Sequence, residues 1–196
     1  MKTTEPIRNK QQIRKLAGYF LLRGQIRNYV LFIIGLHTLL RVSDLLCLKC
    51  DDVYDFASGS VSVRKRITLT EKKTKKTKTI KLHAEIVKAL QLYANQAKEG
   101  AFLFENKQTQ KAISRIQAYR IIRAATDWLG ITESTGCHGL RKTLGYHTLK
   151  DNPDNPKILA TIIQMYNHSS VAITLRYLGI TQDDVDDTYC TARLIC

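Results

Sequence analysis

Apolar residues recur with helical spacing over the first forty positions of the chain. Over residues 10–22 they fall every three or four positions, which places them on one face of a helix, and Asn9 can cap its first turn. Residues 25–38 are apolar on most sides, as in a buried helix, and Gly24 separates the two segments. The pattern therefore predicts a pair of packed helices at the start of the chain.

A two-residue period replaces the helical one between residues 60 and 82. Residues 60–67 and 77–82 alternate apolar and polar side chains, which predicts two antiparallel strands joined as a hairpin. No glycine marks the turn between them, so the register stays open. The turn contains a run of lysines, which is usually a solvated surface but on a basic chain is also typical of a segment that contacts phosphates. The run consists of Lys72, Lys73, Lys75 and Lys76.

Helical spacing returns after residue 82 and continues to residue 178. Glycine, proline and asparagine residues divide this stretch into separate helices. The expected helices cover residues 83–98, 114–129, a segment that opens near residue 137, 156–166 and 169–178. With the hairpin they predict a mostly α-helical α+β fold with a small antiparallel sheet. We expect residues 1–180 to form one domain and residues 181–196 to form an amphipathic tail helix that contacts its own domain or another protomer.

The charge balance indicates a polyanionic partner. The chain has 31 Lys and Arg against 17 Asp and Glu, a formal net charge of +14. Such an excess favours binding to nucleic acid or to an anionic membrane, although some proteins are basic only for solubility. The longest apolar run, residues 29–36, is far too short to span a membrane. We therefore expect no membrane partner.

The cysteines and the N-terminus point to a cytoplasmic protein. Five cysteines are present, and the pair Cys47 and Cys50 has no second Cys or His pair at the spacing of a zinc site. We expect the thiols to be reduced. Residues 1–15 are polar and charged, unlike a signal peptide.

Residues with a shared chemistry stand in a fixed order along the chain. His138 and Arg141 are one helical turn apart, so their side chains can face one site. His168 precedes Tyr177 by nine residues, and Tyr177 lies on the last expected helix. Earlier in the chain, Arg41 begins an apolar segment, in which a charged side chain is unusual unless it has a function. Each has an ordinary explanation when taken alone, such as a solvent-facing arginine or a core tyrosine.

Together these side chains match the needs of phosphodiester cleavage without a metal. Arginine can donate two hydrogen bonds to two phosphate oxygens and stays charged, which offsets the negative charge that builds up on the phosphate. A nucleophile, a base and an acid for the departing sugar oxygen complete the set. A tyrosine phenol, with a pKa of ~10, is a poor nucleophile near neutral pH, but nearby guanidinium groups favour the phenolate. The phosphotyrosine product conserves bond energy, so no ATP, cofactor or metal is expected.

At these residues the chain resembles the catalytic domain of the tyrosine recombinases, the phage integrase family. The resemblance covers about residues 25–180 and rests on five elements in order, each of them weak alone. They are Thr38-Leu-Leu-Arg41-Val-Ser-Asp44-Leu, the hairpin Lys73-Thr-Lys75-Lys76-Thr-Lys-Thr-Ile80, the pair His138-x-x-Arg141, the segment His168-Ser-Ser, and Tyr177.

The resemblance implies a role for each of these residues. Arg41, Arg141 and His168 would bind the scissile phosphate, and Tyr177 would be the nucleophile. His138 would be the general base or a further phosphate ligand.

Two further roles follow from the first arginine segment and the hairpin. Asp44 would support Arg41 structurally. Lys73 would be the general acid, although Lys72 or Lys76 could take that role, because Lys75 stands where the family commonly has glycine.

The implied partner is double-stranded DNA, on which the protein would assemble as a tetrameric synapse. Only forty residues precede Arg41, so we expect no separate N-terminal DNA-clamping domain. That layout is similar to short invertase-type members, and a piece of a longer protein would look the same. The candidate DNA contacts are Lys72, Lys75, Lys76, Arg115, Arg120, Arg123 and Lys142.

The leading interpretation is a site-specific recombinase that acts in integration, excision or inversion. A non-cutting DNA-binding regulator derived from such an enzyme is the alternative, and the complete set of catalytic residue types argues against it. A topoisomerase with the same chemistry is disfavoured by the small size and by the His-Ser-Ser segment. A basic structural or RNA-binding protein would need aromatic stacking surfaces.

Overall fold

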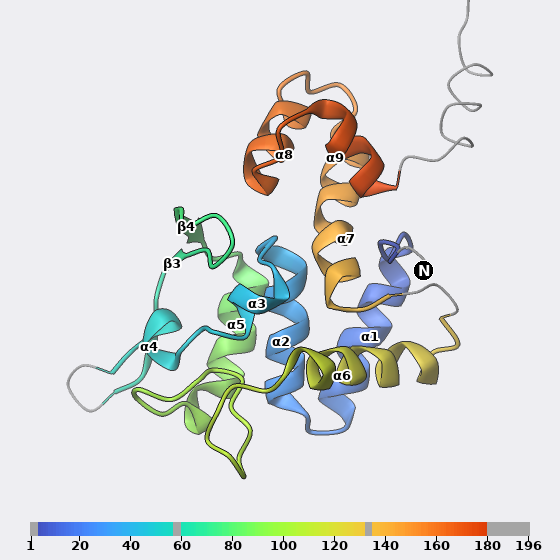
Figure 1. The fold of residues 1–196 in the computed structure, drawn as a ribbon. Coiled ribbons are helices and arrows are strands. Elements are labelled where there is room, and N and C mark those ends of the chain that lie inside the picture. Colours follow the sequence, from blue (N-terminus) through green and yellow to red (C-terminus); the bar gives the residue numbers. More distant parts are fainter. Residues whose placement is uncertain (1–3, 57–59, 132–134, 180–196) are drawn as a thin grey trace, which may run out of the picture.

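A helix buried on most sides organises the body of the molecule in the computed structural model, which describes residues 4–56, 60–131 and 135–179. This helix is α2 (Ile26–His37), and every side chain from Tyr29 to Leu36 is buried. The expectation of a buried second helix is therefore confirmed. Figure 1 shows the helices that surround it. They are α1 (Lys10–Leu22), α5 (Ala84–Tyr93) and α7 (Cys137–Lys150).

Side-chain caps fix where the helices of the body begin. The side chain of Asn9 accepts a hydrogen bond from the backbone N–H of Gln11 at the start of α1, and Ser114 does the same for Gln117 at the start of α6 (Arg115–Trp128). Such caps satisfy backbone donors that the helix itself leaves free. The bounds of α1 match the predicted segment 10–22. A short 3-10 helix, η2 (Ala94–Gln96), follows α5.

The β-structure consists of two short antiparallel pairs. One pair joins β3 (Arg66–Thr70) to β4 (Thr77–Lys81), with Ile67 opposite Ile80. The other joins β1 (Tyr54–Asp55) to β2 (Ser62–Val63). The single strand predicted over residues 60–67 is therefore wrong, because those residues are divided between two sheets. The predicted class, mostly helical with small antiparallel sheets, is confirmed.

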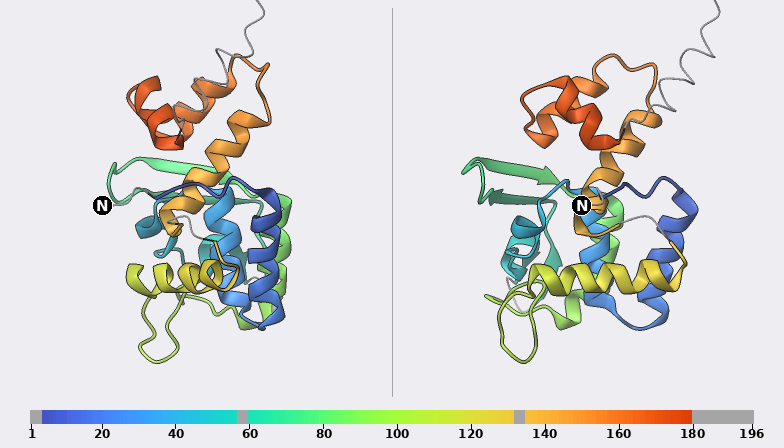
Figure 2. Two further views of the ribbon diagram at one scale, coloured as in Figure 1. Left: turned by 90° about the vertical axis from the view of Figure 1, so that its right-hand side faces the viewer. Right: turned by 45° about the vertical axis from the view of Figure 1, so that its right-hand side comes forward.

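A small lobe stands above the body and is joined to it through α7. Figures 1 and 2 show α7 rising from the body, with α8 (Ile158–Tyr166) and α9 (Val171–Leu178) at its far end. The N-terminal segment braces α7, because the backbone N–H of Ile7 donates to Thr143 Oγ1 over 2.9 Å. Two short helices, α3 (Val42–Leu45) and α4 (Cys50–Val53), lie between α2 and the hairpin.

Two separate groups of buried apolar residues stabilise the body and the lobe. The body has an extensive core drawn from α1, α2, α5 and α6. The lobe has a much smaller one, whose buried members are Leu39, Ile162, Tyr166 and Leu178.

Leu39 packs in the core of the lobe, although it lies only two residues after the end of α2. Its side chain is 1% exposed and packs in the small core, while the next residue, Leu40, packs in the large one. Leu39 has a φ of 54°, in the left-handed region that a branched residue rarely adopts. The segment that leads to Arg41 is therefore fixed to both parts of the molecule.

No helix in the described part of the chain has the length and apolar character that crossing a membrane requires. The predicted tail helix after residue 180 lies outside the described residues.

Candidate active site

Two helices bring the predicted nucleophile against the His-x-x-Arg pair. Tyr177 lies on α9 and His138 on α7, and their rings meet edge to face with centroids 5.1 Å apart. The guanidinium carbon of Arg141 lies 6.0 Å from the centroid of the Tyr177 ring. His138 and Arg141 do face one site, because residues three apart share a helix face.

Arg141 is buried and held from one side by a tyrosine. Its side chain is 3% exposed, and its guanidinium carbon lies 5.1 Å from the ring centroid of Tyr166. The Tyr166 hydroxyl donates to the Arg141 carbonyl over 2.7 Å, which ties α8 to α7. The Nε of Arg141 has no hydrogen-bond partner among the described residues. A buried cation with a free donor is suited to binding an anion.

His168 completes the ring cluster from the junction of α8 and α9. Asn167, with a φ of 57°, ends α8 and turns the chain so that His168 stacks on Tyr166 with centroids 5.0 Å apart. The Nδ1 of His168 lies 3.0 Å from Thr174 Oγ1, which orients the imidazole. His168 meets the Tyr177 ring at 5.1 Å. The structure thus brings together four of the residues predicted from the sequence.

The hydroxyl of Tyr177 is buried and has no hydrogen-bond partner among residues 4–56, 60–131 and 135–179. Burial raises the pKa of Tyr177 to about 12, and the charges of Arg141 and Arg41 act against that rise. The phenol is therefore neutral in this conformation. If a phosphate lay beside the two guanidinium groups, the Tyr177 hydroxyl would have to move in order to reach it.

Both histidines have lowered pKa values. For His138, which is exposed as a whole residue, partial burial of the imidazole lowers the pKa first, followed by the charges of Arg141, Lys142 and Arg41. Burial, Arg141 and Arg41 also lower the pKa of His168. Neutral imidazoles at pH 7 can accept a proton, which is what a general base must do.

Arg41 reaches the site from the start of α3, where it is the N-cap residue. Its Nη1 lies 3.0 Å from Glu71 Oε2, in an ion pair rather than an aligned hydrogen bond. The side chain of Glu71 is 6% exposed and that of Arg41 is 22% exposed. Arg41 therefore has one side against a buried carboxylate and still has exposed surface.

Asp44 is joined to Arg41 through the backbone, because its N–H donates to the Arg41 carbonyl over 2.8 Å. Its Oδ1 accepts a hydrogen bond from the backbone N–H of Lys72 over 3.0 Å, so this carboxylate fixes the start of the hairpin turn. The acid that pairs with Arg41 is Glu71, from the end of β3.

The hairpin lysines differ in what they contact. Cys47 lies beside Lys72 and raises the pKa of the lysine, while Arg115 opposes the rise. Lys76 Nζ donates to Asn167 Oδ1 over 3.1 Å. Lys73 and Lys75 are exposed, and within the described residues their ammonium groups form no hydrogen bond or ion pair. Lys75 has a φ of 57°, the backbone conformation that glycine would favour.

Sequence reasoning missed Glu71 and Lys78 as members of the site. Lys78 Nζ donates to the Met165 carbonyl over 2.8 Å at the end of α8. Burial lowers the pKa of Lys78, and the charges of Glu71, Arg141 and Arg41 also act on it, so it lies among these residues. The alternation of β4 was the available signal, since it puts Lys78 on the same face as Ile80.

The structure corrects the expected place of Lys142. This residue was expected on a DNA-contacting surface, but its side chain is 5% exposed and its Nζ lies 5.1 Å from the Tyr177 ring centroid. Burial lowers the pKa of Lys142, and the charge of Glu5 opposes that shift. Lys142 therefore lies inside the molecule beside the Tyr177 ring.

The three arginines of α6 are not equivalent. Arg115 and Arg120 are exposed. Arg123 is half-buried and forms an ion pair with Asp127 one turn further along the helix. Only the first two have side chains fully available for a polyanion.

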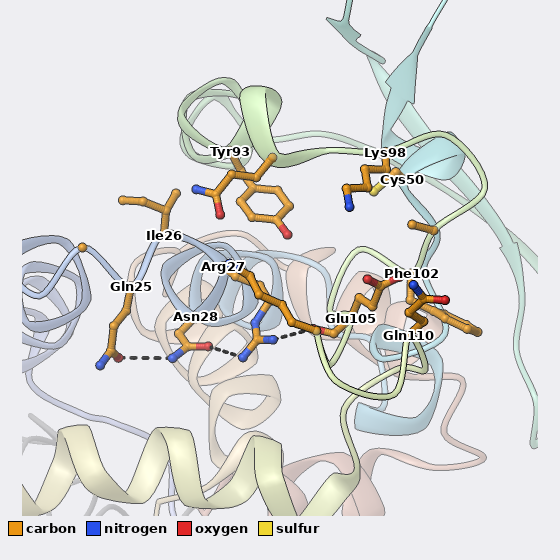
Figure 3. Close-up of a pocket in the computed structure, with 14 residues that line it drawn as sticks. Gln25, Ile26, Arg27, Asn28, Cys50, Tyr93, Lys98, Phe102, Glu105 and Gln110 are labelled. Atoms are coloured by element: carbon orange, nitrogen blue, oxygen red, sulfur yellow. Dashed lines mark hydrogen bonds between the residues drawn. The ribbon is translucent and has the colours of Figure 1, made fainter.

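A cavity of about 600 Å³ lies far from this cluster, beside the N-terminus of α2 and the end of α5 (Figure 3). Arg27 lines it and donates to the Glu105 carbonyl and to Asn28 Oδ1. The cavity contains none of the predicted catalytic residues. The size of this cavity does not identify the active site, because a DNA duplex binds on an open surface and not inside a cavity. No three His, Cys, Asp or Glu side chains converge on a metal site in the described part of the chain.

The arrangement can bind and activate a phosphodiester. Two arginines supply positive charge, neutral histidines can accept protons, and the Tyr177 ring meets both histidines and lies 6.0 Å from the guanidinium carbon of Arg141. Two buried atoms of this cluster, Arg141 Nε and Tyr177 Oη, have no hydrogen-bond partner among the described residues.

Known proteins resemble this chain over most of its length. Residues 9–183 match the Phage integrase family. The chain is 38% identical over 189 residues to "Probable integrase/recombinase YoeC" of Bacillus subtilis (strain 168), which covers 96% of this chain and 97% of the relative.

Solved structures share the fold. The XerA recombinase superposes with a TM-score of 0.73 at 22% identity, over 99% of this chain and 68% of that one. The XerH site-specific recombinase, solved in a post-cleavage complex with its palindromic difH substrate, gives a TM-score of 0.69 at 18% identity, over 96% and 54%. From the match over residues 9–183 and the YoeC relationship, the chain belongs to the phage integrase family and is a tyrosine-type site-specific recombinase.

Proposed function

We propose that the protein cleaves and rejoins double-stranded DNA through a 3′-phosphotyrosine intermediate. The observation that carries this proposal is the position of Tyr177 against Arg141, His138 and His168. The phenol oxygen attacks the phosphorus and the bond from phosphorus to the 5′ oxygen breaks. The phenol proton passes to the base, and the acid protonates the departing 5′ oxygen. Resealing is the reverse of these steps, so neither ATP nor a metal is required.

Arg41, Arg141 and His168 bind the scissile phosphate in this scheme, and His138 takes the phenol proton. The lowered pKa of His138, caused by burial and then by nearby cations, suits that role because the imidazole is neutral before the step. The phosphate carries more negative charge in the transition state than in the ground state. Two arginines therefore bind the transition state more strongly, which lowers the barrier to cleavage.

Lys73 is our choice for the general acid. Three other hairpin lysines have neighbours of their own, since Cys47 lies beside Lys72, Lys76 donates to Asn167 and Lys78 donates to Met165, while Lys75 is as exposed as Lys73. Lys73 is exposed in the turn and can reach the departing oxygen.

The DNA surface would run from the hairpin to the N-terminal half of α6. Lys75, Arg115 and Arg120 are exposed there, and Arg115 lies close enough to influence Lys72. Contacts of this kind position the backbone, so binding should weaken steeply with salt. Exchange between two duplexes needs a nucleophile for each of the strands cut, so we propose a tetrameric synapse on DNA in the cytoplasm.

A nicked suicide duplex tests the proposal. The duplex should carry a site from the DNA that flanks the gene and a nick near the cleavage point, so that the short product leaves. The wild-type protein should form a covalent adduct with EDTA present, and Tyr177→Phe should form none while binding the duplex equally well. An adduct with Tyr177→Phe, or loss of the wild-type adduct in EDTA, would contradict the mechanism.

A further inference from the structure

Glu71 contacts both the arginine of the phosphate site and the turn that carries the proposed acid. Its Oε2 lies 3.0 Å from Arg41 Nη1 and accepts a hydrogen bond from Thr74 Oγ1 over 2.6 Å. One carboxylate oxygen therefore joins two parts of the site that are thirty residues apart in sequence.

The backbone of Glu71 also closes the turn. Its N–H donates to the Lys76 carbonyl over 3.0 Å, and its carbonyl accepts from the Lys75 N–H over 2.9 Å. Lys73 lies between Lys72, whose N–H is held by Asp44, and Thr74, whose hydroxyl is held by Glu71. The position of Lys73 thus depends on these two anchors.

The ion pair is on the inner side of Arg41. Nη1 is fully buried, and Glu71 as a whole is 4% exposed, so the carboxylate lies behind the guanidinium group. The remaining exposed part of Arg41 is available for a phosphate. Glu71 therefore orients Arg41 without blocking its outer side.

The charge of Glu71 is retained in this environment. Burial alone would raise its pKa, but the Thr74 hydrogen bond and the charges of Arg41 and Lys78 outweigh that effect and lower it. An ionised carboxylate offsets the repulsion between cations that must lie close together to hold one phosphate.

Resting on the proposed function, we infer that Glu71 is a positioning residue that couples the phosphate ligand Arg41 to the turn bearing the general acid Lys73. The contact with Arg41 sets phosphate binding, and the contact with Thr74 sets delivery of the proton. The two effects can be separated by chemistry, because a sulfur leaving group departs without a proton whereas an oxygen leaving group needs one.

The experiment compares cleavage of the suicide duplex with that of a duplex whose bridging 5′ oxygen is replaced by sulfur. Thr74→Val removes the turn anchor and leaves the Arg41 pair. It should slow cleavage of the oxygen duplex by about tenfold or more, and cleave the sulfur duplex within about twofold of wild type. Glu71→Gln keeps the shape but loses the charge behind Arg41, so it should be slow on both duplexes.

Two controls accompany these variants. Thr74→Ser keeps the hydroxyl and should cleave both duplexes like wild type. Thr79→Val removes a hydroxyl of the same hairpin that pairs with Thr68 Oγ1, at 3.1 Å, and should also behave like wild type. Wild-type rates for Glu71→Gln, or a Thr74→Val defect that persists on the sulfur duplex, would overturn the inference.

The proposed function fails in a different way. If the wild-type protein forms no adduct with either duplex, the cleavage mechanism and the role of Glu71 are both wrong. If the sulfur duplex restores the cleavage rate of Thr74→Val but not that of Lys73→Ala, the turn still delivers the acid and another lysine supplies the proton.

Discussion

The body and the lobe of this protein differ in how much buried apolar surface stabilises them. The body carries Arg41 and the hairpin on a core drawn from four long helices. The lobe carries His168 and Tyr177 on α8 and α9, whose own core has four buried members. Segments with few buried contacts open locally at lower free energy than the core does. Arg41 and the hairpin are therefore on the more rigid part, and His168 and Tyr177 are on the part that opens most easily.

That difference matches the state of Tyr177, the proposed nucleophile. The Tyr177 hydroxyl is buried without a partner, and burial raises its pKa to about 12 against the opposing charges of Arg141 and Arg41. An attack on DNA requires this oxygen to leave its buried position. Because the core on which α9 packs is small, such a displacement costs little free energy. Three predictions follow the contrast from its largest expected effect to its smallest.

Gly145→Ala should break the attachment of the lobe. Gly145 faces the lobe from α7, and an added Cβ would clash with the Tyr166 hydroxyl and lie 2.6 Å from Leu178 Cδ2. Both neighbours belong to the small core, so α8 and α9 must shift. A displacement of about 1 Å can cost on the order of 100-fold in rate, and we expect adduct formation to fall by about that factor. Hydrogen exchange should speed up in α8 and α9 but not in α2.

Gly18→Ala is the matched control for this substitution. Gly18 lies within α1, and an added Cβ there would meet nothing within 4 Å. Replacing glycine by alanine in a helix should raise the free energy of unfolding by about 1 kcal/mol. Adduct formation should not change. Equal loss of activity in both variants would mean that the rate reports global stability and not the attachment of the lobe.

Acid should weaken the body through His37, at the end of α2. Burial lowers the pKa of His37 to about 4, the charge of neighbouring His83 adds to that effect, and Glu85 opposes it. The unfolded chain binds this proton near pH 6.5 and the folded chain only near pH 4, so stability is complete above pH 6.5 and falls as the pH drops between these values. The loss from this group is at most about 3 kcal/mol.

His37→Phe should remove that part of the acid dependence. The ring can still stack on His83, whose centroid lies 4.5 Å away, but it binds no proton. Denaturant unfolding at pH 7 and pH 4.5 measures the effect. The difference in unfolding free energy between the two pH values should be smaller in the variant; an equal difference would show that other groups cause the acid loss.

Thr174→Val should have the smallest effect, because it changes orientation within the lobe and not its attachment. The substitution keeps the volume and removes the Oγ1 that lies 3.0 Å from His168 Nδ1 and donates to the Ser170 carbonyl over 3.3 Å. Of these two hydrogen bonds only the one to His168 orients the imidazole, and a hydrogen bond is worth about 1 kcal/mol, so we expect a fall of about fivefold in the rate of adduct formation. Thermal unfolding of the body should be unaffected. A loss as large as that of Gly145→Ala would place Thr174 in the packing of the lobe.

Local geometry explains which parts of the site could be predicted from the sequence. His138 and Arg141 share a helix turn, and the period of the helix alone puts them on one face. The limits of α1 followed from an apolar period and a cap at Asn9. The family resemblance supplied the link to Tyr177, and the structure brings these residues together.

Tertiary packing explains what could not be predicted. The orientation of Lys142 depends on the Tyr177 ring and on the segment containing Glu5, neither of which leaves a local signal on α7. The hairpin register was open because no glycine marked the turn, and Lys75 takes the left-handed conformation in its place. Without that register, the carboxylate of Glu71 could not be matched to Arg41.

The conformation of Leu39 has a consequence for engineering this enzyme. A glycine there would relax a backbone that costs about 1 kcal/mol or more to hold, yet it would also remove a side chain that fills the small core. Leu39 packs with Leu178 of α9 in this core, so a displacement of α9 would act on the chain two residues before Arg41. Variants at this position should therefore alter the timing between phosphate capture and attack, more than either event alone.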